Sequence, residues 1–340
     1  MLRFVLMLAL ILGAIYFIAT GTRTGQDFLL ERMVRLAVTP PAAPFDGLRV
    51  LLCGTSSPLP APDRAQACVA VEAGGRLFVV DAGAGSAANL AAASLDRLEA
   101  VLLTHFHSDH VSALGDINLN SWVAGRPAPL DVIGPAGVEQ IVAATNALYT
   151  LDRGYRVAHH GADLLPPALH VLRPRTIEPG VILDDAELVI AAFPVDHAPV
   201  APAVGYRFDY RGRSVVISGD SIATGSLVEA ARGADLLLHD ALSLPIVTAL
   251  ERASAAAGRD RQARILSDIQ DYHASTASLG ELAESAGVGT LAVYHLVPPP
   301  RNFLMEKIFR RDLPSGTVIT TDRMVFELPT GSERVRLIEP

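Results

Sequence analysis

The sequence predicts a layered α/β body in one domain, preceded by an apolar N-terminal helix. Hydrophobic residues fill 50% of the 340 positions and charged residues 19%, so the chain can bury a full core and lacks the composition of a disordered protein. From residue 46 onward, short apolar strands interleave with helical segments, and no break in composition interrupts them. This alternation is typical of sheets covered by helices.

The first 21 residues form the apolar segment. After Met1-Leu2-Arg3, residues 4–19 carry no charge and would span about 24 Å as a helix, against roughly 30 Å of bilayer hydrocarbon. No cleavage site of small residues follows the run. We therefore expect an uncleaved signal anchor over residues 1–21, which crosses the inner membrane once and leaves the body on the periplasmic side. Cleavage and secretion are the alternative.

Residues 22–46 connect this segment to the body. Apolar positions lie among charges over residues 24–37, which predicts a short amphipathic helix. Thr39-Pro40-Pro41-Ala42-Ala43-Pro44 has the composition of a stiff linker. The body is then expected to cover residues 47–340.

Within the body, apolar runs that end at turn residues predict the strands. The expected strands cover residues 48–53, 68–72, 77–81, 101–104, 130–133, 188–193, 203–210, 214–218, 236–238 and 290–294, with two more pieces within 317–328. Helices are expected over residues 136–148, 276–286 and 302–311. Ala73-Gly74-Gly75-Arg76 and Arg211-Gly212 are turn signals between neighbouring strands.

The placement of the histidines predicts a metal site. Thr104-His105-Phe106-His107-Ser108-Asp109-His110 puts three imidazoles and a carboxylate directly after a buried strand. In extended backbone, His105 and His107 share a face with their Cα atoms about 6.5–7 Å apart, while Asp109 and His110 turn into the next helix. Imidazole and carboxylate ligands without thiolate are typical of catalytic zinc, manganese or iron, and approach from two directions suits two adjacent ions.

Further ligand-type residues follow other predicted strands, namely His197, Asp220, His239 and His295. Loops at strand ends converge on the active sites of α/β folds. Any one of these residues alone is better explained as a core or loop residue. As a set, they predict one common site.

The charge balance and the cysteines exclude several classes of protein. The chain carries 28 basic and 36 acidic residues, a net charge of −8, so no global basic field attracts nucleic acid. Cys53 and Cys68 are too few for a disulfide scaffold or a cysteine-based zinc module. The two lie on early strands and could form a disulfide in an exported protein; two small buried thiols are the alternative.

The run His105-x-His107-x-Asp109-His110 resembles the signature of the metallo-β-lactamase fold superfamily, and His197, Asp220 and His295 match its later ligands. The similarity covers roughly residues 47–328. Within the superfamily, the chain resembles the branch that holds ribonuclease Z and the zinc-dependent arylsulfatases. The segments that carry this narrower resemblance are Leu52–Pro58, Val79–Gly85, His239-Asp240-Ala241 and Tyr272–Thr276.

This resemblance implies an αββα sandwich with two Zn²⁺ ions along one edge, Mn²⁺ or Fe²⁺ being alternatives. The implied ligands are His105, His107 and His197 for one ion, Asp109, His110 and His295 for the other, and Asp220 as the bridge between them. A hydroxide held between two cations would attack the ester bond. Asp109 and Asp220 are therefore counted among the catalytic residues as well as the ligands.

Three further residues receive roles from the resemblance. His239 is the expected proton donor to the leaving alkoxide, and Asp240 is expected to position it. Asp81 is expected to accept hydrogen bonds that orient the ligand loop. For Asp81 the alternative is an ordinary turn aspartate at a strand end.

We expect the substrate to be a small anionic ester, either a phosphodiester or an aryl sulfate. Ribonuclease Z-like processing of tRNA 3′ ends is the alternative. Ribonuclease Z carries an inserted arm that grips tRNA, but only 22 residues separate His197 from Asp220, and the interval from 110 to 197 has no basic cluster. These absences and the net charge argue against a nucleic-acid substrate, and they leave a homodimer open.

The segment from Asp152 to Gly161 resembles one found in the arylsulfatase-like members. It carries Arg156, His159 and His160, which we expect to reach an anionic ester oxygen from a loop over the metals. A solvated polar loop without contact to substrate is the alternative.

Overall fold

The computed structural model describes residues 2–37, 45–59, 61–185 and 187–340. It divides into two compact units, Met1–Ala43 and Pro44–Pro340. The predicted stiff linker over residues 39–44 lies outside the described residues.

The first unit consists of two helices, α1 (Leu2–Gly21) and α2 (Arg23–Ala37). The helix α1 covers the apolar segment, and α2 covers the segment in which a short helix was expected. Across the part of the chain that the structure describes, no helix is both long and apolar enough to cross a bilayer. The predicted transmembrane anchor is therefore not supported.

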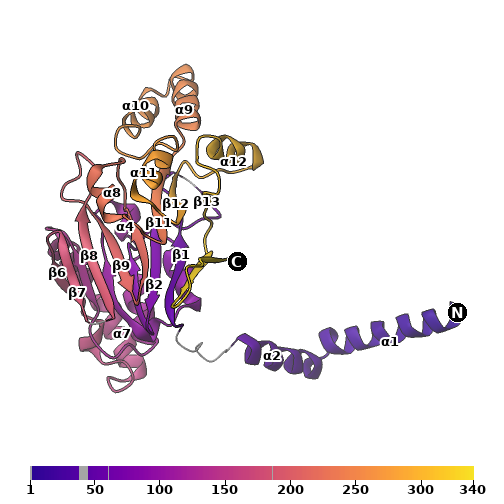
Figure 1. Cartoon of the computed structure of the whole chain (residues 1–340). Coiled ribbons are helices and arrows are strands. Elements are labelled where there is room, and N and C mark those ends of the chain that lie inside the picture. The colour runs from indigo at the N-terminus through magenta and orange to yellow at the C-terminus, as the bar shows by residue number, and fades with distance from the viewer. Residues whose placement is uncertain (1, 38–44, 60, 186) are drawn as a thin grey trace. The chain divides into compact units, whose positions relative to one another are not determined.

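The second unit contains two sheets (Figure 1). In the first sheet the strands lie in the order β15 (Arg336–Ile338), β14 (Val325–Pro329), β1 (Gly47–Gly54), β2 (Cys68–Ala73), β3 (Arg76–Val80), β4 (Leu98–Leu102), β5 (Asp131–Gly134) and β6 (Arg173–Thr176). In the second they lie in the order β13 (Val318–Ile319), β12 (Thr290–Val297), β11 (Leu236–Leu242), β10 (Arg213–Ile217), β9 (Val204–Tyr210), β8 (Leu188–Pro194) and β7 (Gly180–Asp184).

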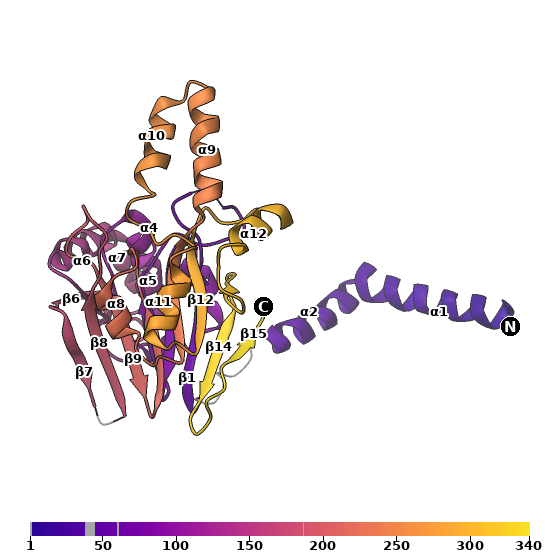
Figure 2. The same ribbon diagram turned by 45° about the horizontal axis from the view of Figure 1, so that its top comes forward.

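Helices cover the outer face of each sheet. The helices that come between the strands of the first sheet are α3 (Ser86–Asn89), α4 (Ser108–Val111), α5 (Leu114–Val123), α6 (Val138–Leu148) and α7 (Thr150–His160). The second sheet has α8 (Gly225–Ala230), α11 (Leu279–Ala286) and α12 (Phe303–Arg310). The helices α9 (Leu244–Ala256) and α10 (Asp260–Asp268) pack against each other and project beyond one end of the sheets (Figures 1 and 2).

Three buried apolar clusters hold these layers together. One lies between the two sheets and is built from side chains of β1–β4 and β8–β12. A second lies between the first sheet and α5 and α6, and a third between the second sheet and α8, α11 and α12. The predicted α/β sandwich of two sheets between helices is therefore confirmed.

The turn signals are confirmed as well. Gly74 and Gly75, with φ of 59° and 83°, join β2 to β3. Arg211 and Gly212, with φ of 46° and 80°, join β9 to β10. Left-handed backbone at both central positions matches the twist of the paired strands, which favours such two-residue turns in hairpins.

Several elements differ from the expectation. The segment expected as a loop over residues 152–161 belongs to helix α7. The late helix begins at Leu279 instead of Thr276, because the preceding residues pair with β11: the backbone N–H of Thr276 donates to the carbonyl of Leu242. The helices α5, α9 and α10 and the edge strands β6, β7 and β15 were not expected.

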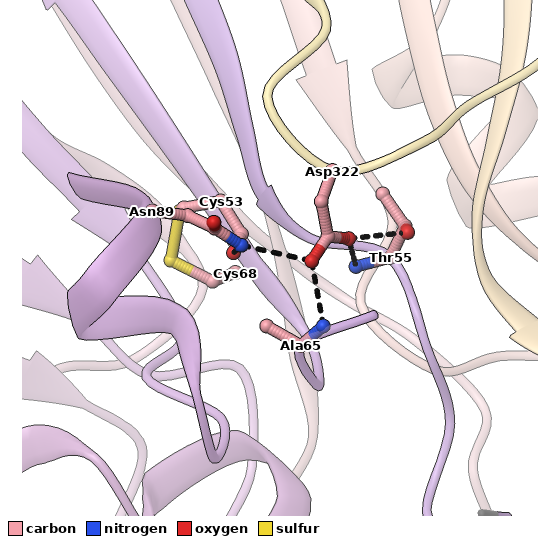
Figure 3. The surroundings of a disulfide bond; sticks show 6 residues. All are labelled: Cys53, Thr55, Ala65, Cys68, Asn89 and Asp322. Atoms are coloured by element: carbon pink, nitrogen blue, oxygen red, sulfur yellow. Dashed lines mark hydrogen bonds between the residues drawn. A yellow bond between two sulfur atoms is a disulfide. The ribbon is translucent and has the colours of Figure 1, made fainter. Parts of the chain in front are cut away.

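Cys53 on β1 and Cys68 at the start of β2 form a disulfide, as the sequence left open (Figure 3). Beside it, the carboxylate of Asp322 accepts hydrogen bonds from the backbone and hydroxyl of Thr55, the backbone N–H of Ala65 and the side-chain amide of Asn89 (Figure 3). The disulfide joins β1 to β2, and this carboxylate ties the loop after β1 to the segment between β13 and β14.

Candidate metal centre

The loop that carries the first ligand candidates is anchored by Asp81. Asp81 follows β3 in left-handed backbone, with φ of 59°, and is buried. Its carboxylate accepts hydrogen bonds from the backbone N–H of Thr104 at 2.8 Å and from its hydroxyl at 2.9 Å. It also lies 2.8 Å from Nδ1 of His110. Asp81 thus contacts both ends of the loop that carries His105, His107, Asp109 and His110. This is the contact that the resemblance implies.

One group of ring nitrogens converges from two loops. Nε2 of His105 lies 3.0 Å from Nδ1 of His107, which lies 3.4 Å from Nε2 of His197. Two nitrogens bound to one tetrahedral zinc ion at about 2.0–2.1 Å would be about 3.3 Å apart. The spacing of these three nitrogens therefore fits ligation of one ion. The other ring nitrogen of His197 lies 3.0 Å from the backbone carbonyl of Tyr272, to which it can donate.

A second group comprises Asp109, His110 and His295, all buried. Nε2 of His295 lies 3.0 Å from Oδ2 of Asp109, and Nε2 of His110 lies 3.6 Å from the same oxygen. Because Asp81 holds Nδ1 of His110, Nε2 of that ring is the nitrogen that faces the cluster. The arrangement fits a second ion beside the first.

Asp220 lies between the two groups. Its Oδ2 is 3.3 Å from Nε2 of both His110 and His295, 3.8 Å from Nε2 of His197 and 4.0 Å from Nε2 of His105. One carboxylate thus approaches ligand candidates of both groups. This is the place that the sequence assigns to a bridging ligand.

Turns in the backbone direct Asp220 and His295 toward the cluster. Gly219, with φ of 65°, precedes Asp220, and a Cβ there would lie 2.9 Å from the Cβ of Thr104. Only glycine allows this close approach. His295 has φ of 43°, because the pairing of β12 with β11 slips by one residue at this point. Non-glycine residues in left-handed backbone gather at functional sites.

The donor set of the cluster fits metal ions. Nε2 of His110 and Oδ1 of Asp220 are buried and have no hydrogen-bond partner among the described residues. A buried polar atom without a partner is costly, and a cation would remove that cost for both atoms. The seven side chains offer nitrogen and oxygen only, which suits zinc, manganese or iron.

The charged groups of the cluster shift one another's pKa values. Burial by itself raises the pKa of Asp220, but His295 and His110 outweigh it and hold the pKa of that carboxyl well below its usual range. Burial lowers the pKa of His110, but Asp220 and Asp81 outweigh it and raise the pKa well above the usual value. A cation that binds here replaces ring protons, so metal binding should release protons.

Comparison with known proteins decides the family. The profile described as the metallo-beta-lactamase superfamily matches residues 61–269, which include His105, His107, Asp109, His110, His197 and Asp220. The chain belongs to the metallo-β-lactamase superfamily.

Among curated members of the superfamily, the ribonuclease Z of Mycobacterium bovis (strain BCG / Pasteur 1173P2) is 41% identical over 256 residues, 74% of this chain and 86% of that protein. The ribonuclease Z of Mycobacterium tuberculosis (strain ATCC 25618 / H37Rv) is 40% identical over the same length, again 74% of this chain and 86% of that protein.

Among solved structures, the short form of human tRNase Z has a TM-score of 0.58 at 18% identity, covering 83% of this chain and 99% of that one. The metallo-beta-lactamase fold protein YhfI from Bacillus subtilis has a TM-score of 0.57 at 19% identity, covering 83% of this chain and all of that one. At these identities the two structures support the fold alone.

The histidine that lies beside the metal-ligand candidates is His273 and not His239, the expected proton donor. Oδ2 of Asp240 is 2.9 Å from Nδ1 of His273, and Oδ1 of Asp240 is 2.9 Å from Nδ1 of His239. The ring of His273 stacks on that of His295 with centroids 5.4 Å apart, and it groups with Asp220 and His295. His239 is buried, and across the described residues no hydrogen bond, ion pair or ring contact joins it to the metal-ligand candidates.

The sequence held a signal for His273. It lies in Tyr272–Thr276, one of the segments that carry the resemblance to the ribonuclease Z branch. Because Asp240 contacts both rings, its predicted positioning role is compatible with either histidine. The structure brings His273 to the cluster.

The three expected substrate-binding residues are not brought to the cluster. Arg156, His159 and His160 lie on α7, which has no buried residue, and Nε of Arg156 pairs with Asp152 at 2.7 Å. Throughout the described ranges, no interaction links the three to the metal-ligand candidates. This segment is a surface helix and not the expected loop over the site.

A cavity of about 490 Å³ opens onto the cluster. Its lining includes His107 and His197 together with residues of α10 and of the turn that follows it. His107 is exposed, whereas His105, Asp109, His110, His197, Asp220 and His295 are buried. Substrate can therefore approach the metal-ligand candidates from the side of His107.

Proposed function

We propose that this chain is a zinc-dependent phosphodiesterase of the ribonuclease Z type, which hydrolyses a phosphodiester bond of RNA. The observation that carries the proposal is the convergence of His105, His107 and His197 with Asp109, His110 and His295 around Asp220. The ribonuclease Z relatives, which share up to 41% identity with this chain over 86% of their length, supply the substrate class.

This proposal replaces the expectation of a small ester as the main substrate. The net charge and the short interval between His197 and Asp220 argued against nucleic acid, but the curated relatives favour the ribonuclease alternative. They give no support to an aryl sulfate as substrate. The short interval between His197 and Asp220 and the net negative charge then bear on how the chain holds RNA. They do not exclude cleavage of RNA.

Two Zn²⁺ ions fit the donor set, one held by His105, His107 and His197 and the other by Asp109, His110 and His295, with Asp220 shared. When bound, two such ions would supply an activated water and stabilise charge on the phosphoryl oxygens. The protein's part is to orient its ligands. Asp81 holds the ring of His110, and the left-handed backbone of Gly219 and His295 turns Asp220 and His295 toward the cluster.

The proton for the leaving oxygen would come from His273. The carboxylate of Asp240 receives Nδ1–H of His273, which fixes the tautomer and leaves the other ring nitrogen to carry a proton toward the substrate. The ring of His273 lies beside that of His197, with centroids 5.4 Å apart. His239, the residue expected for this role, makes no contact with the metal-ligand candidates among the described residues.

The test is a cleavage assay with the zinc-loaded full chain. The substrates are a precursor tRNA with a 3′ extension, bis(p-nitrophenyl) phosphate and p-nitrophenyl sulfate, and the blank is His107→Ala. We expect zinc-dependent cleavage of both phosphodiesters and none of the sulfate. Turnover of the sulfate without cleavage of either phosphodiester would refute the proposal.

A further inference from the structure

A helical hairpin stands beside the metal-ligand candidates. It consists of α9 and α10, which pack against each other and project from one end of the sandwich in both views (Figures 1 and 2). Along the chain it lies between β11, which carries Asp240, and His273. The hairpin is therefore inserted between two residues that meet at the site, although few of its own side chains are buried.

The hairpin completes the cavity that opens onto the cluster. Arg264 and Asp268 of α10 line this cavity together with Asp271 and Tyr272, as do His107 and His197. Ala198, Pro199 and Val200 complete the lining. A volume of about 490 Å³ lies in the range of pockets that enclose a small ligand.

Arg264 has the geometry of an anion-binding side chain. Its side chain is 78% exposed, and its Nε is paired with Oδ1 of Asp268 at 2.9 Å. A guanidinium held through Nε keeps its two terminal amino groups for a second partner, and it pairs with phosphate in a fork. Asp268 thus orients Arg264 in the cavity without using the whole guanidinium.

Tyr272 supplies an aromatic surface in the same cavity. Its ring packs against the rings of His197 and His273, with centroids 5.2 Å and 4.9 Å away. An aromatic side chain that is fixed by such neighbours can stack with a nucleobase at low entropic cost. The carboxylates of Asp268 and Asp271 in the cavity repel a dense polyanion, but they can accept hydrogen bonds from sugar hydroxyls.

We propose that this cavity binds one nucleotide next to the scissile bond, with Arg264 pairing its phosphate and Tyr272 packing against its base. This inference rests on the proposed phosphodiesterase function and specifies how the substrate is held. The chain then recognises RNA locally, through one nucleotide beside the metal centre, and the inserted hairpin is the element that provides this recognition.

The test compares Arg264→Ala with Arg252→Ala, which removes the same charge from an exposed position of α9 that lines none of the cavities described here. Both are assayed on a short single-stranded RNA and on bis(p-nitrophenyl) phosphate, which has no second phosphate. For Arg264→Ala we expect kcat/KM on the RNA to fall about 10- to 100-fold, mainly through KM. The loss on the aryl ester should be at least tenfold smaller, and Arg252→Ala should match the wild type on both.

Salt dependence separates a phosphate contact from a structural effect. One phosphate contact contributes about 0.7 to the slope of log(kcat/KM) against log[salt] for a single strand. Arg264→Ala should lower the slope by about this amount, and Arg264→Lys should restore the slope but not the full affinity, because lysine lacks the fork. Tyr272→Leu should weaken RNA cleavage about tenfold, whereas Tyr272→Phe should not.

Binding of the same RNA to the metal-free protein distinguishes the two proposals. If the wild type cleaves RNA but Arg264→Ala and Arg252→Ala have equal Kd and equal slopes, the nucleotide cavity is refuted and the proposed function stands. If the wild type cleaves no RNA yet binds it in a manner that depends on Arg264, the proposed function fails and the cavity stands. Absence of RNA binding by the wild type overturns the cavity as well.

Discussion

At the scale of single residues, spacing along the sequence identified the metal-ligand candidates but not His273, the proton donor that we propose. His105, His107, Asp109 and His110 are close in sequence, so their convergence follows from one strand and one turn. The choice between His239 and His273 depends on which ring turns toward the cluster. That depends on the pairing of β11 with β12, which no local pattern contains.

His273→Gln therefore tests the proton donor. Loss of a positioned acid typically lowers kcat by about 10²- to 10⁴-fold, and we expect this for His273→Gln with the metal content unchanged. His239→Gln, the matched control, should retain kcat within a few fold. Metal content and RNA cleavage are measured on both variants. A larger loss in His239→Gln than in His273→Gln would return the role to His239.

His170 should make stability depend on pH. It is 1% exposed, packs against Trp122, and has no hydrogen-bond partner on either ring nitrogen among the described residues. Burial and the nearby Arg153 lower the pKa of His170 to about 4. This folded-state pKa lies below the unfolded value of about 6.5. The contribution of neutral His170 to the free energy of unfolding is therefore fully present above pH 6.5 and is lost as the pH falls toward 4.

The size of this effect follows from the difference in pKa. Between pH 7 and pH 4, the free energy of unfolding of the wild type should fall by about 3 kcal/mol more than that of His170→Leu. Urea unfolding at both pH values measures it, with the exposed His159→Leu as control. Equal pH dependence in wild type and His170→Leu would contradict the prediction.

At the scale of elements, periodicity predicted the strands and failed for helices that bury little. The helix α7 exposes Leu151 and Tyr155 and buries no residue, so its apolar side chains do not pack on a core. The helix α10 buries only Leu266. Both helices carry mostly polar side chains, which is why one was expected to be a loop and the other was not expected at all.

The disulfide between β1 and β2 gives a prediction at this scale. The cysteines are 15 residues apart, and closing a loop of this length stabilises a protein by about 3 kcal/mol. Reduction should lower the free energy of unfolding by about this amount, whereas reductant should not affect a variant with both Cys53→Ala and Cys68→Ala. Two reactive thiols in the denatured, unreduced wild type would show that the bond does not form.

At the scale of the whole molecule, the sequence predicted the layers but not the order of the strands. The N-terminal strand β1 lies between β2 and the C-terminal strand β14. Such neighbours depend on contacts between distant parts of the chain. The fold then brings the loops that follow β4, β8 and β10 together with His295 on β12. This makes a single site of residues that lie up to 190 positions apart, from His105 to His295.

The measurement that tests this account most directly is the metal content of the purified chain. We expect two zinc ions per chain in the wild type by inductively coupled plasma mass spectrometry. Asp220→Ala should lose both, because Oδ2 of Asp220 approaches ligand candidates of each group. The exposed Asp163→Ala is the control and should bind as the wild type does. Wild-type stoichiometry in Asp220→Ala, with the fold intact by circular dichroism, would contradict the shared metal centre.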